Sequence, residues 1–261
     1  MYLISNNMDR KIPEVIFQDE NFVLINKPAG MIVNKADTAK DEYTVQDWVW
    51  ENYKLPTTPV GQALLSEYQL DNSSEFSRRG GIVHRLDKET SGALIVALNE
   101  ASFVFLQNQF KERTVIKEYL ALVHGKLVAE GEINVPIGRL PWNRMRFGVI
   151  PQGRQSYTKF KTLYHKKLVV GRDSEELSLV EVYPQTGRTH QIRVHMQYAG
   201  HPIFADILYA GRKTVARDRK HLSRHFLHAS KISFISPTSN KRDTFVSPLT
   251  SELVDFLGQL A

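Results

Sequence analysis

The chain contains no cysteine, which excludes disulfides, iron–sulfur clusters and thiolate zinc sites. It also lacks a long hydrophobic run, since the longest one, Ala93 to Leu98, is far shorter than the ~18 residues of a membrane-spanning helix. The opening residues MYLISNNMDRK show no basic start followed by the apolar stretch of a signal peptide. These absences favour a soluble cytoplasmic protein without membrane attachment.

Positive charge is in excess, with 34 Lys and Arg against 28 Asp and Glu, a formal charge of +6 and a pI near 9.4. A basic chain favours a polyanionic partner such as nucleic acid. Two clusters carry much of this charge, and solvated surface faces would account for either one alone. Together they favour a polyanion without indicating any sequence specificity. The first comprises Arg139, Arg144, Arg146, Arg154, Lys159 and Lys161 with no acid among them, and the second comprises Arg212, Lys213, Arg217, Arg219, Lys220 and Arg224 with Asp218 alone.

The hydrophobic pattern predicts strands and helices that are interspersed without strict alternation. We therefore expect an α+β fold with a mixed, largely antiparallel central sheet flanked by helices. One domain is expected over residues 13–261, after an N-terminal extension at 1–12, and residues 55–80 predict a long surface excursion. Predicted strands cover residues 22–26, 92–98, 116–123, 176–183 and 226–234, and predicted helices cover 99–113 capped by Asn99, 189–200 capped by Thr189 and ended by Gly200, and 251–260.

Asp87 lies in GIVHRLDKETSGALIVALN, in a predicted turn directly before a buried strand. One interpretation is a turn residue whose carboxylate accepts the backbone N–H of Glu89 or Thr90. The other is a carboxylate nucleophile or base that a loop at a strand end presents to substrate. Such a group needs a positive charge nearby to remain ionised in a partly dry site, and Arg193, in the first turn of the 189–200 helix, is a candidate.

The segment GRTHQIRVH contains His190 and His195, and one interpretation is that these histidines bind a metal ion. Their spacing places them about 140° apart on a helix and on opposite faces of a strand, and no HExxH arrangement is present, so metal binding is disfavoured. A basic helix start that binds phosphate stays open. Tyr119 is either a core tyrosine or part of a polar cleft, and Lys117 on the same strand face favours the cleft.

Five segments carry a family resemblance and occur in the family's order along the chain: DENFVLINKPAGMIV, GIVHRLDKETSG, KEYLALVHG, GRTHQIRVHMQYAGHPIFAD and FLHASKISF. From residue 15 to the C-terminus the chain resembles the RluA-type RNA pseudouridine synthase family. The resemblance implies the pseudouridine synthase catalytic-domain fold with a central RNA-binding cleft. It also implies isomerisation of specific uridines in structured RNA, either ribosomal or transfer RNA, with no metal and no other cofactor. Because the sequence starts almost at the expected catalytic domain, we expect it to lack the S4 RNA-binding domain that many relatives carry.

The resemblance also implies residue roles. Asp87 aligns with the catalytic aspartate that attacks the uridine, at the anomeric carbon or at the base, and Arg193 aligns with its ion-pair partner. Tyr119 aligns with the tyrosine that stacks on the base and assists removal of the carbon 5 proton. Arg85 resembles the residue that enters the RNA stack when the target nucleotide leaves it. Further substrate- or RNA-binding residues are His84, Thr90, Lys117, Arg188, His190, Gln191 and Leu227, the last as an apolar wall.

Two competing functions remain. A non-catalytic RNA-binding protein would show steeply salt-dependent binding, with a slope near −0.7 per phosphate contact on single strands, and no change in uridine. A histidine-metal hydrolase would purify with stoichiometric metal. Asp87, an acid amid basic RNA-facing residues, favours the enzyme over the RNA-binding protein, and no bound metal is expected. A monomer is expected, because no apolar stripe is left over for an interface.

Overall fold

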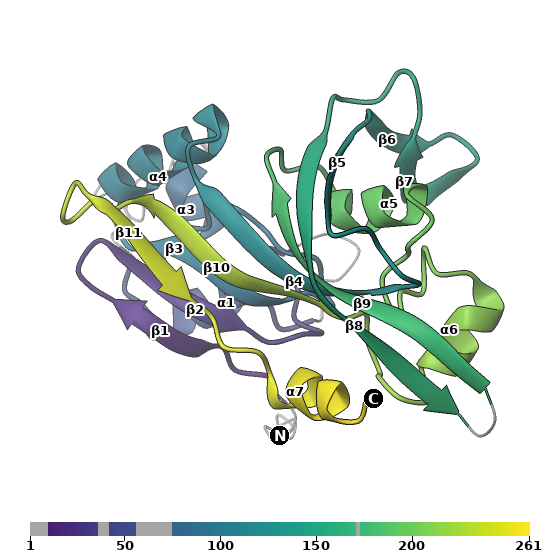
Figure 1. The fold of residues 1–261 in the computed structure, drawn as a ribbon. Coiled ribbons are helices and arrows are strands. Elements are labelled where there is room, and N and C mark those ends of the chain that lie inside the picture. Colours follow the sequence, from purple (N-terminus) through teal and green to yellow (C-terminus); the bar gives the residue numbers. More distant parts are fainter. Residues whose placement is uncertain (1–9, 36–41, 56–74, 171–172) are drawn as a thin grey trace, which may run out of the picture.

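A computed structural model of the protein describes residues 10–35, 42–55, 75–170 and 173–261. Within them, a nine-stranded sheet and a separate two-stranded hairpin are flanked by helices, as Figure 1 shows. This confirms the predicted α+β class. The strands are β1 (Glu14–Gln18), β2 (Phe22–Lys27), β3 (Ser91–Ala97), β4 (Ile116–His124), β5 (Glu130–Asn134), β6 (Ile137–Leu140), β7 (Asn143–Val149), β8 (Tyr157–Val170), β9 (Asp173–Pro184), β10 (Leu227–Ile235) and β11 (Arg242–Val246). The helices are α1 (Val45–Asn52), α3 (Glu75–Arg79), α4 (Glu100–Glu112), α5 (Gln191–Tyr198), α6 (Arg212–Asp218) and α7 (Ser251–Gly258).

The sheet order brings together the loop before β3, the start of β10 and the middle of β4. It runs β1-β2-β3-β10-β4-β9-β8-β5, with β11 also paired to β10. Only the β3–β10 pair is parallel among the pairs of this sheet, and His228 of β10 lies opposite Ser91 of β3. Parallel strands begin at the same edge, so the loop before β3 and Leu227 at the start of β10 are neighbours. Tyr119 of β4 joins them, opposite Ala229.

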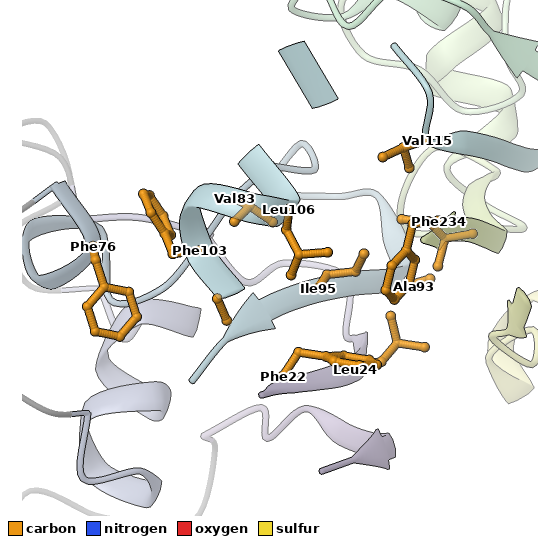
Figure 2. Packing of buried hydrophobic residues seen from close by; sticks show 12 residues of the cluster. Phe22, Leu24, Phe76, Val83, Ala93, Ile95, Phe103, Leu106, Val115 and Phe234 are labelled. Atoms are coloured by element: carbon orange, nitrogen blue, oxygen red, sulfur yellow. The ribbon is translucent and has the colours of Figure 1, made fainter. Parts of the chain in front are cut away.

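One part of the core lies between α4 and the β2–β3–β10 part of the sheet (Figure 2). Phe103 and Leu106 of α4 are buried in the same hydrophobic cluster as Phe22 and Phe234 of the strands. The helix starts as predicted, because the Asn99 side chain accepts the Ser102 N–H at 2.9 Å and so satisfies a free donor of the first turn. This packing fixes the C-terminal end of α4 beside the start of β4.

The predicted cap of α5 is wrong. His190, not Thr189, is the N-cap, with a left-handed φ of 55° and no side-chain capping bond. The physical reason is the Gln191 amide, whose oxygen accepts the Arg188 N–H at 3.0 Å and the Thr186 hydroxyl at 2.6 Å. These bonds tie the preceding loop to the first helical residue. Gly200, with φ of 83°, follows the helix end as predicted.

The predicted surface excursion at 55–80 is only partly described. Its last residues form α3, from which Phe76 is buried against Phe103 with ring centroids 5.8 Å apart. Residues 56–74 lie outside the described part of the chain. No helix among the described residues is long and apolar enough to cross a membrane.

A buried charge cluster joins β4, β9 and α6. His124 faces a carboxylate with each ring nitrogen, Nδ1 lying 2.9 Å from Glu175 Oε1 and Nε2 lying 2.9 Å from Asp218 Oδ2. Burial alone would lower the pKa of His124, but the hydrogen bonds and charges of the two carboxylates outweigh it and raise the pKa to about 9. These three side chains are close enough to hold a metal ion. Because both nitrogens already face carboxylates, an imidazolium ion is the cation that this arrangement fits.

Replacing His124 by Gln is expected to remove pH-dependent stability. The folded pKa of His124 lies above the unfolded value of 6.5, so its stabilising contribution is complete below pH 6.5 and is lost as pH rises through about 9. The variant should therefore lose about 3 kcal/mol at pH 6 and progressively less toward pH 9.5. Urea unfolding of wild type and variant at pH 6, 7.5 and 9.5 measures this. A pH-independent difference would contradict the charged state assigned to His124.

Candidate active site

A cleft of about 430 Å³ opens between α4 and α5, on the face of the sheet that these two helices cover. Its walls come from the end of α4, the start of β4, the loop before β3, the β9–α5 loop and the start of β10. Every residue that the sequence predicted for the site lines this cleft. They are His84, Arg85, Asp87, Thr90, Lys117, Tyr119, Arg188, His190, Gln191, Arg193 and Leu227.

The Asp87 turn forms as predicted, but its carboxylate is not used to make it. The Thr90 N–H donates to the backbone carbonyl of Asp87 at 3.1 Å, and the carboxylate instead accepts Arg193 Nη1 on Oδ2 at 2.9 Å. The predicted turn is thus present, but the predicted bond from Glu89 or Thr90 N–H to the carboxylate is wrong. The predicted pairing with Arg193 is right about the side chain.

Lys27, which was not among the predicted site residues, is buried and supports the Asp87 loop through a bond to the Lys88 carbonyl. Lys27 Nζ donates to the carbonyls of Pro28 at 2.9 Å, Met31 at 2.9 Å and Lys88 at 3.2 Å. Burial, followed by the charge of Arg224, lowers the pKa of Lys27 to about 7. A lysine closing an otherwise apolar strand before proline was the available signal, because a buried Lys needs carbonyl partners.

Asp206 orients Arg193 and was also missed. Its fully buried carboxylate accepts Arg193 Nε at 2.7 Å and Nη2 at 2.9 Å, which leaves Nη1 for Asp87. Burial would raise the pKa of Asp206, but the Arg193 hydrogen bonds and charge outweigh it and hold the pKa below its usual range. A planar guanidinium suits such a two-carboxylate bridge, because its donors are fixed in a fork. The signal was an acid among the apolar residues of HPIFAD.

A second contact reaches the same oxygen of Asp87. His190 Nε2 lies 3.8 Å from Oδ2, while its Nδ1 lies 2.9 Å from the Tyr209 hydroxyl. Tyr209 also accepts the Phe147 N–H at 3.2 Å, and the Arg193 guanidinium lies over its ring at 5.1 Å. Since both contacts fall on Oδ2, Oδ1 has no hydrogen-bond partner within the described residues. Oδ1 is therefore the oxygen that a substrate can reach.

Tyr119 forms a half-buried wall of the cleft and packs with Leu227. Burial, and then the charge of Asp87, raise its pKa well above the usual range, so it is a neutral phenol at physiological pH. Lys117 shares its strand face, as predicted, and burial followed by the charge of Arg113 lowers the pKa of Lys117 to about 8. The wall is aromatic at its centre and cationic toward Arg113.

Two of the predicted RNA-binding side chains keep charge available at the cleft. Arg85 is exposed, and Arg188 makes only long hydrogen bonds, at 3.4 and 3.5 Å, to the carbonyl of Gln155. Within the described residues, neither side chain forms an ion pair. Both suit contacts with phosphate or bases.

Three other predicted RNA-binding residues, Gln191, Thr90 and His84, form side-chain hydrogen bonds within the protein. Gln191 also donates to the Tyr157 carbonyl at 3.0 Å and the Thr158 hydroxyl at 2.9 Å, so its amide makes four internal bonds. Thr90 bonds His225 at 2.9 Å. His84 Nε2 accepts the Ile95 N–H at 3.0 Å, and burial lowers the pKa of His84 to about 3. These bonds hold the three side chains in the wall of the cleft, and His84 Nδ1, which carries the proton when Nε2 accepts, has no hydrogen-bond partner within the described residues.

The predicted basic clusters differ in a way that sequence did not reveal. In the second, Arg217 pairs with Glu175, Arg219 with Glu89, and Arg224 with Glu252. The six cations of the first cluster form no ion pair within the described residues, and they lie on β6, β7, β8 and the segment between β7 and β8. The first cluster is therefore the better candidate for a polyanion-binding surface.

His190 and His195 do not form a metal site with each other. His195 Nδ1 bonds the Thr158 hydroxyl at 2.9 Å, whereas His190 bonds Tyr209. Among the described residues, the grouping with metal-ligand distances is His124, Glu175 and Asp218. The expected absence of a metal stays a prediction.

Comparison with models of known protein families gives a match over more than half of the chain. A model of the RNA pseudouridylate synthase family matches residues 21–198, which include Asp87, Tyr119 and Arg193. The chain belongs to this family. The RluA-type resemblance of the sequence motifs is thereby confirmed.

RNA pseudouridine synthases of other organisms align with most of the chain. An uncharacterized RNA pseudouridine synthase of Chloroflexus aurantiacus is 38% identical over 90% of this chain and 65% of its own length. The ribosomal large subunit pseudouridine synthase D of Zymomonas mobilis is 31% identical over 95% and 73%. The chain spans just under two thirds of the Chloroflexus relative.

Solved structures show the same fold. Human RNA pseudouridylate synthase domain containing 1 superposes with a TM-score of 0.68 and 26% identity, covering 94% of this chain and 87% of that one. The human domain-containing 4 protein has a TM-score of 0.64 at 22% identity, covering 95% and 94%, and supports the fold alone. The predicted fold is thus confirmed.

Proposed function

We propose that the protein isomerises uridine in RNA to pseudouridine, with Asp87 as the nucleophile. The observation that carries this proposal is the asymmetry of the Asp87 carboxylate. Arg193 and His190 lie on Oδ2, and Oδ1 is left without a partner in a cleft walled by Tyr119 and Leu227. A paired but unobstructed carboxylate beside an apolar and aromatic wall suits a nucleophile for a nucleoside.

The proposed reaction needs no electrons from outside. Oδ1 of Asp87 bonds to the anomeric carbon of the uridine while the bond to nitrogen 1 breaks, and the bonding pair leaves with the uracil as an anion. Carboxylates perform the same displacement in retaining glycosidases. The uracil turns, its carbon 5 bonds to the anomeric carbon, and the carboxylate leaves with its electron pair. Loss of the proton on carbon 5 and gain of a proton at nitrogen 1 complete the isomerisation.

We assign removal of the carbon 5 proton to Tyr119, which is a neutral phenol. Its ring can stack on the uracil, and its hydroxyl oxygen can accept the carbon 5 proton while its own proton passes to water. The carbon 5 proton leaves after the carboxylate has departed, so the charge of Asp87, which is one cause of the raised pKa of Tyr119, is present at this step and keeps the phenol protonated.

The uridine has to leave the RNA stack to reach Asp87, which costs a few kcal/mol. The exposed guanidinium of Arg85, at the mouth of the cleft, can fill the vacated place, since its planar group stacks on bases. We propose structured ribosomal or transfer RNA as the substrate. The relative named for the ribosomal large subunit supports the ribosomal arm.

The test is tritium release from RNA labelled at carbon 5 of uridine, with transfer and ribosomal RNA fractions supplied separately. Wild-type protein should release tritium to water from at least one fraction, because carbon 5 loses its hydrogen in the reaction. The fraction that responds identifies the substrate class. Tight, salt-dependent RNA binding without release from either fraction would favour an RNA-binding protein that lacks the chemistry.

A further inference from the structure

The β6–β7 hairpin carries the most exposed apolar side chains of the described residues. Trp142, in the turn, is 78% exposed, and Met145 of β7 is 77% exposed. Neither contributes burial to the core. A tryptophan and a methionine that remain on a tip in water mark an interaction site, because isolated surface positions rarely leave this much apolar area together.

Charge identifies the partner class. The hairpin carries Arg139, Arg144 and Arg146, all in the first basic cluster, which contains no acid from 139 to 161. A second copy of this chain would place these cations against the same cations. Nucleic acid offers both an anionic backbone and flat bases that stack on aromatic rings.

The hairpin is held in one shape. Arg139 Nη1 donates to the Arg144 carbonyl across the turn at 2.6 Å, and its guanidinium lies over the Phe147 ring at 4.9 Å. These contacts use the Arg139 side chain within the hairpin. They leave Arg144 and Trp142 as the side chains that the tip presents, on a preorganised support.

The base of the hairpin touches the candidate active site. The Phe147 ring lies edge-on to His190, with centroids 5.7 Å apart, and Arg146 lies 5.3 Å from the centre of the Tyr209 ring. His190 lines the cleft beside Asp87. In Figure 1 the hairpin stands above α5.

We propose that the tip of the β6–β7 hairpin binds an unpaired base of the substrate RNA, which stacks on Trp142 and is flanked by Met145 while Arg144 contacts the adjacent phosphate. This inference rests on the proposed function, since it concerns the same RNA. Trp142 lies ~17 Å along β7 from Phe147, at about 3.3 Å per residue. The tip therefore contacts RNA outside the cleft that receives the target uridine.

The experiment measures RNA binding by Trp142→Ala, Trp142→Phe and Arg144→Gln. The probes are a 20-nucleotide oligouridylate and a 20-base-pair RNA duplex. Trp142→Ala should weaken oligouridylate binding on the order of 10-fold, whereas Trp142→Phe retains a stacking ring and stays near wild type. Arg144→Gln should lower the salt slope by about 0.7, and Trp142→Ala should leave the slope unchanged. Duplex binding should not depend on Trp142.

Tryptophan fluorescence provides a second measurement of base stacking on Trp142. Oligouridylate should quench the emission of wild type and of Trp50→Phe, and the quenching should disappear in Trp142→Phe. Val128→Ala, which truncates another exposed apolar side chain, is the matched control for affinity and should bind as wild type does. Equal thermal unfolding of all variants shows that the fold is retained.

Several results would overturn the inference. They are unchanged oligouridylate affinity in Trp142→Ala, an equal loss on the duplex, or a sedimentation change showing that Trp142 joins two copies of the chain. Tritium release by wild type separates the two proposals. If release occurs and Trp142→Ala binds normally, only the hairpin proposal fails. If no RNA releases tritium but Trp142 is required for binding, only the isomerase proposal fails.

Discussion

Replacing Asp87 by Asn is expected to abolish tritium release from uridine-labelled RNA. Asparagine has nearly the same shape, but its amide oxygen carries no charge and cannot form the bond to the anomeric carbon. Loss of a covalent nucleophile lowers turnover on the order of 10³-fold or more. RNA affinity should stay within a few-fold of wild type, because the basic and aromatic surfaces remain.

The fold should also survive this substitution. Asp87 Oδ2 accepts one hydrogen bond from Arg193, and an asparagine carbonyl can accept it as well. Arg193 keeps both bonds to the buried Asp206. Thermal unfolding and filter binding of wild type and variant measure the two properties. Asp255→Asn, an exposed carboxylate of α7, is the control for removing one negative charge and should remain active.

Substantial turnover by Asp87→Asn would mean that another group attacks the uridine. The attack at the base, the alternative chemistry for the same carboxylate, predicts the same loss. The experiment therefore tests the residue and not the atom it attacks. A trapped adduct on Asp87, cleaved and located by mass spectrometry, would distinguish the atoms.

The sequence predicted the local parts of the site well. The Asp87 turn, the β3 run and the α5 helix depend on neighbouring residues, and each formed close to the predicted bounds. The meeting of Asp87 with Arg193, 106 residues away, followed from family resemblance and not from periodicity. Periodicity cannot place two segments beside each other, because the strand order β3-β10-β4-β9, which brings the loop before β3 toward α5, is a property of the whole sheet.

The strands β5 to β8 escaped prediction for a physical reason. Several of them are half-exposed and carry charged residues on their outer face, so apolar periodicity is weak, as in the β7 sequence NRMRFGV. Their pairing with a neighbouring strand stabilises them instead. Long-range partners explain the second basic cluster as well. Glu89, Glu175 and Glu252 lie far from it in sequence, so composition could not show that half of its cations are neutralised.

Replacing Asp206 by Asn is expected to cost both stability and activity. The substituted amide can accept only one of the two Arg193 bonds, and its NH₂ group faces another donor. Removing one partner of a buried ion pair typically destabilises by about 3–5 kcal/mol. Arg193 would then be free to turn, and a shift of ~1 Å at the carboxylate can lower turnover about 10²-fold. Urea unfolding and tritium release measure the two losses.

A comparison with His124→Gln separates positioning from lost stability. That variant removes a buried charge that does not touch the cleft, and at pH 6 it should lose a similar amount of stability. At a low temperature where both variants are fully folded, His124→Gln should turn over as wild type does, whereas Asp206→Asn should keep a reduced kcat. Equal activity of the two variants would contradict a positioning role for Asp206.

Combining Asp206→Asn with Arg193→Lys tests whether Asp206 acts through Arg193. Arg193→Lys retains the positive charge near Asp87 but cannot bridge two carboxylates, because an ammonium group lacks the planar fork. If Asp206 acts only through Arg193, then Asp206→Asn should cost little further activity in the Arg193→Lys background, and the two effects on kcat should be strongly non-additive. Additive effects would mean that Asp206 supports the reaction through another contact, such as its bond to the Leu208 N–H.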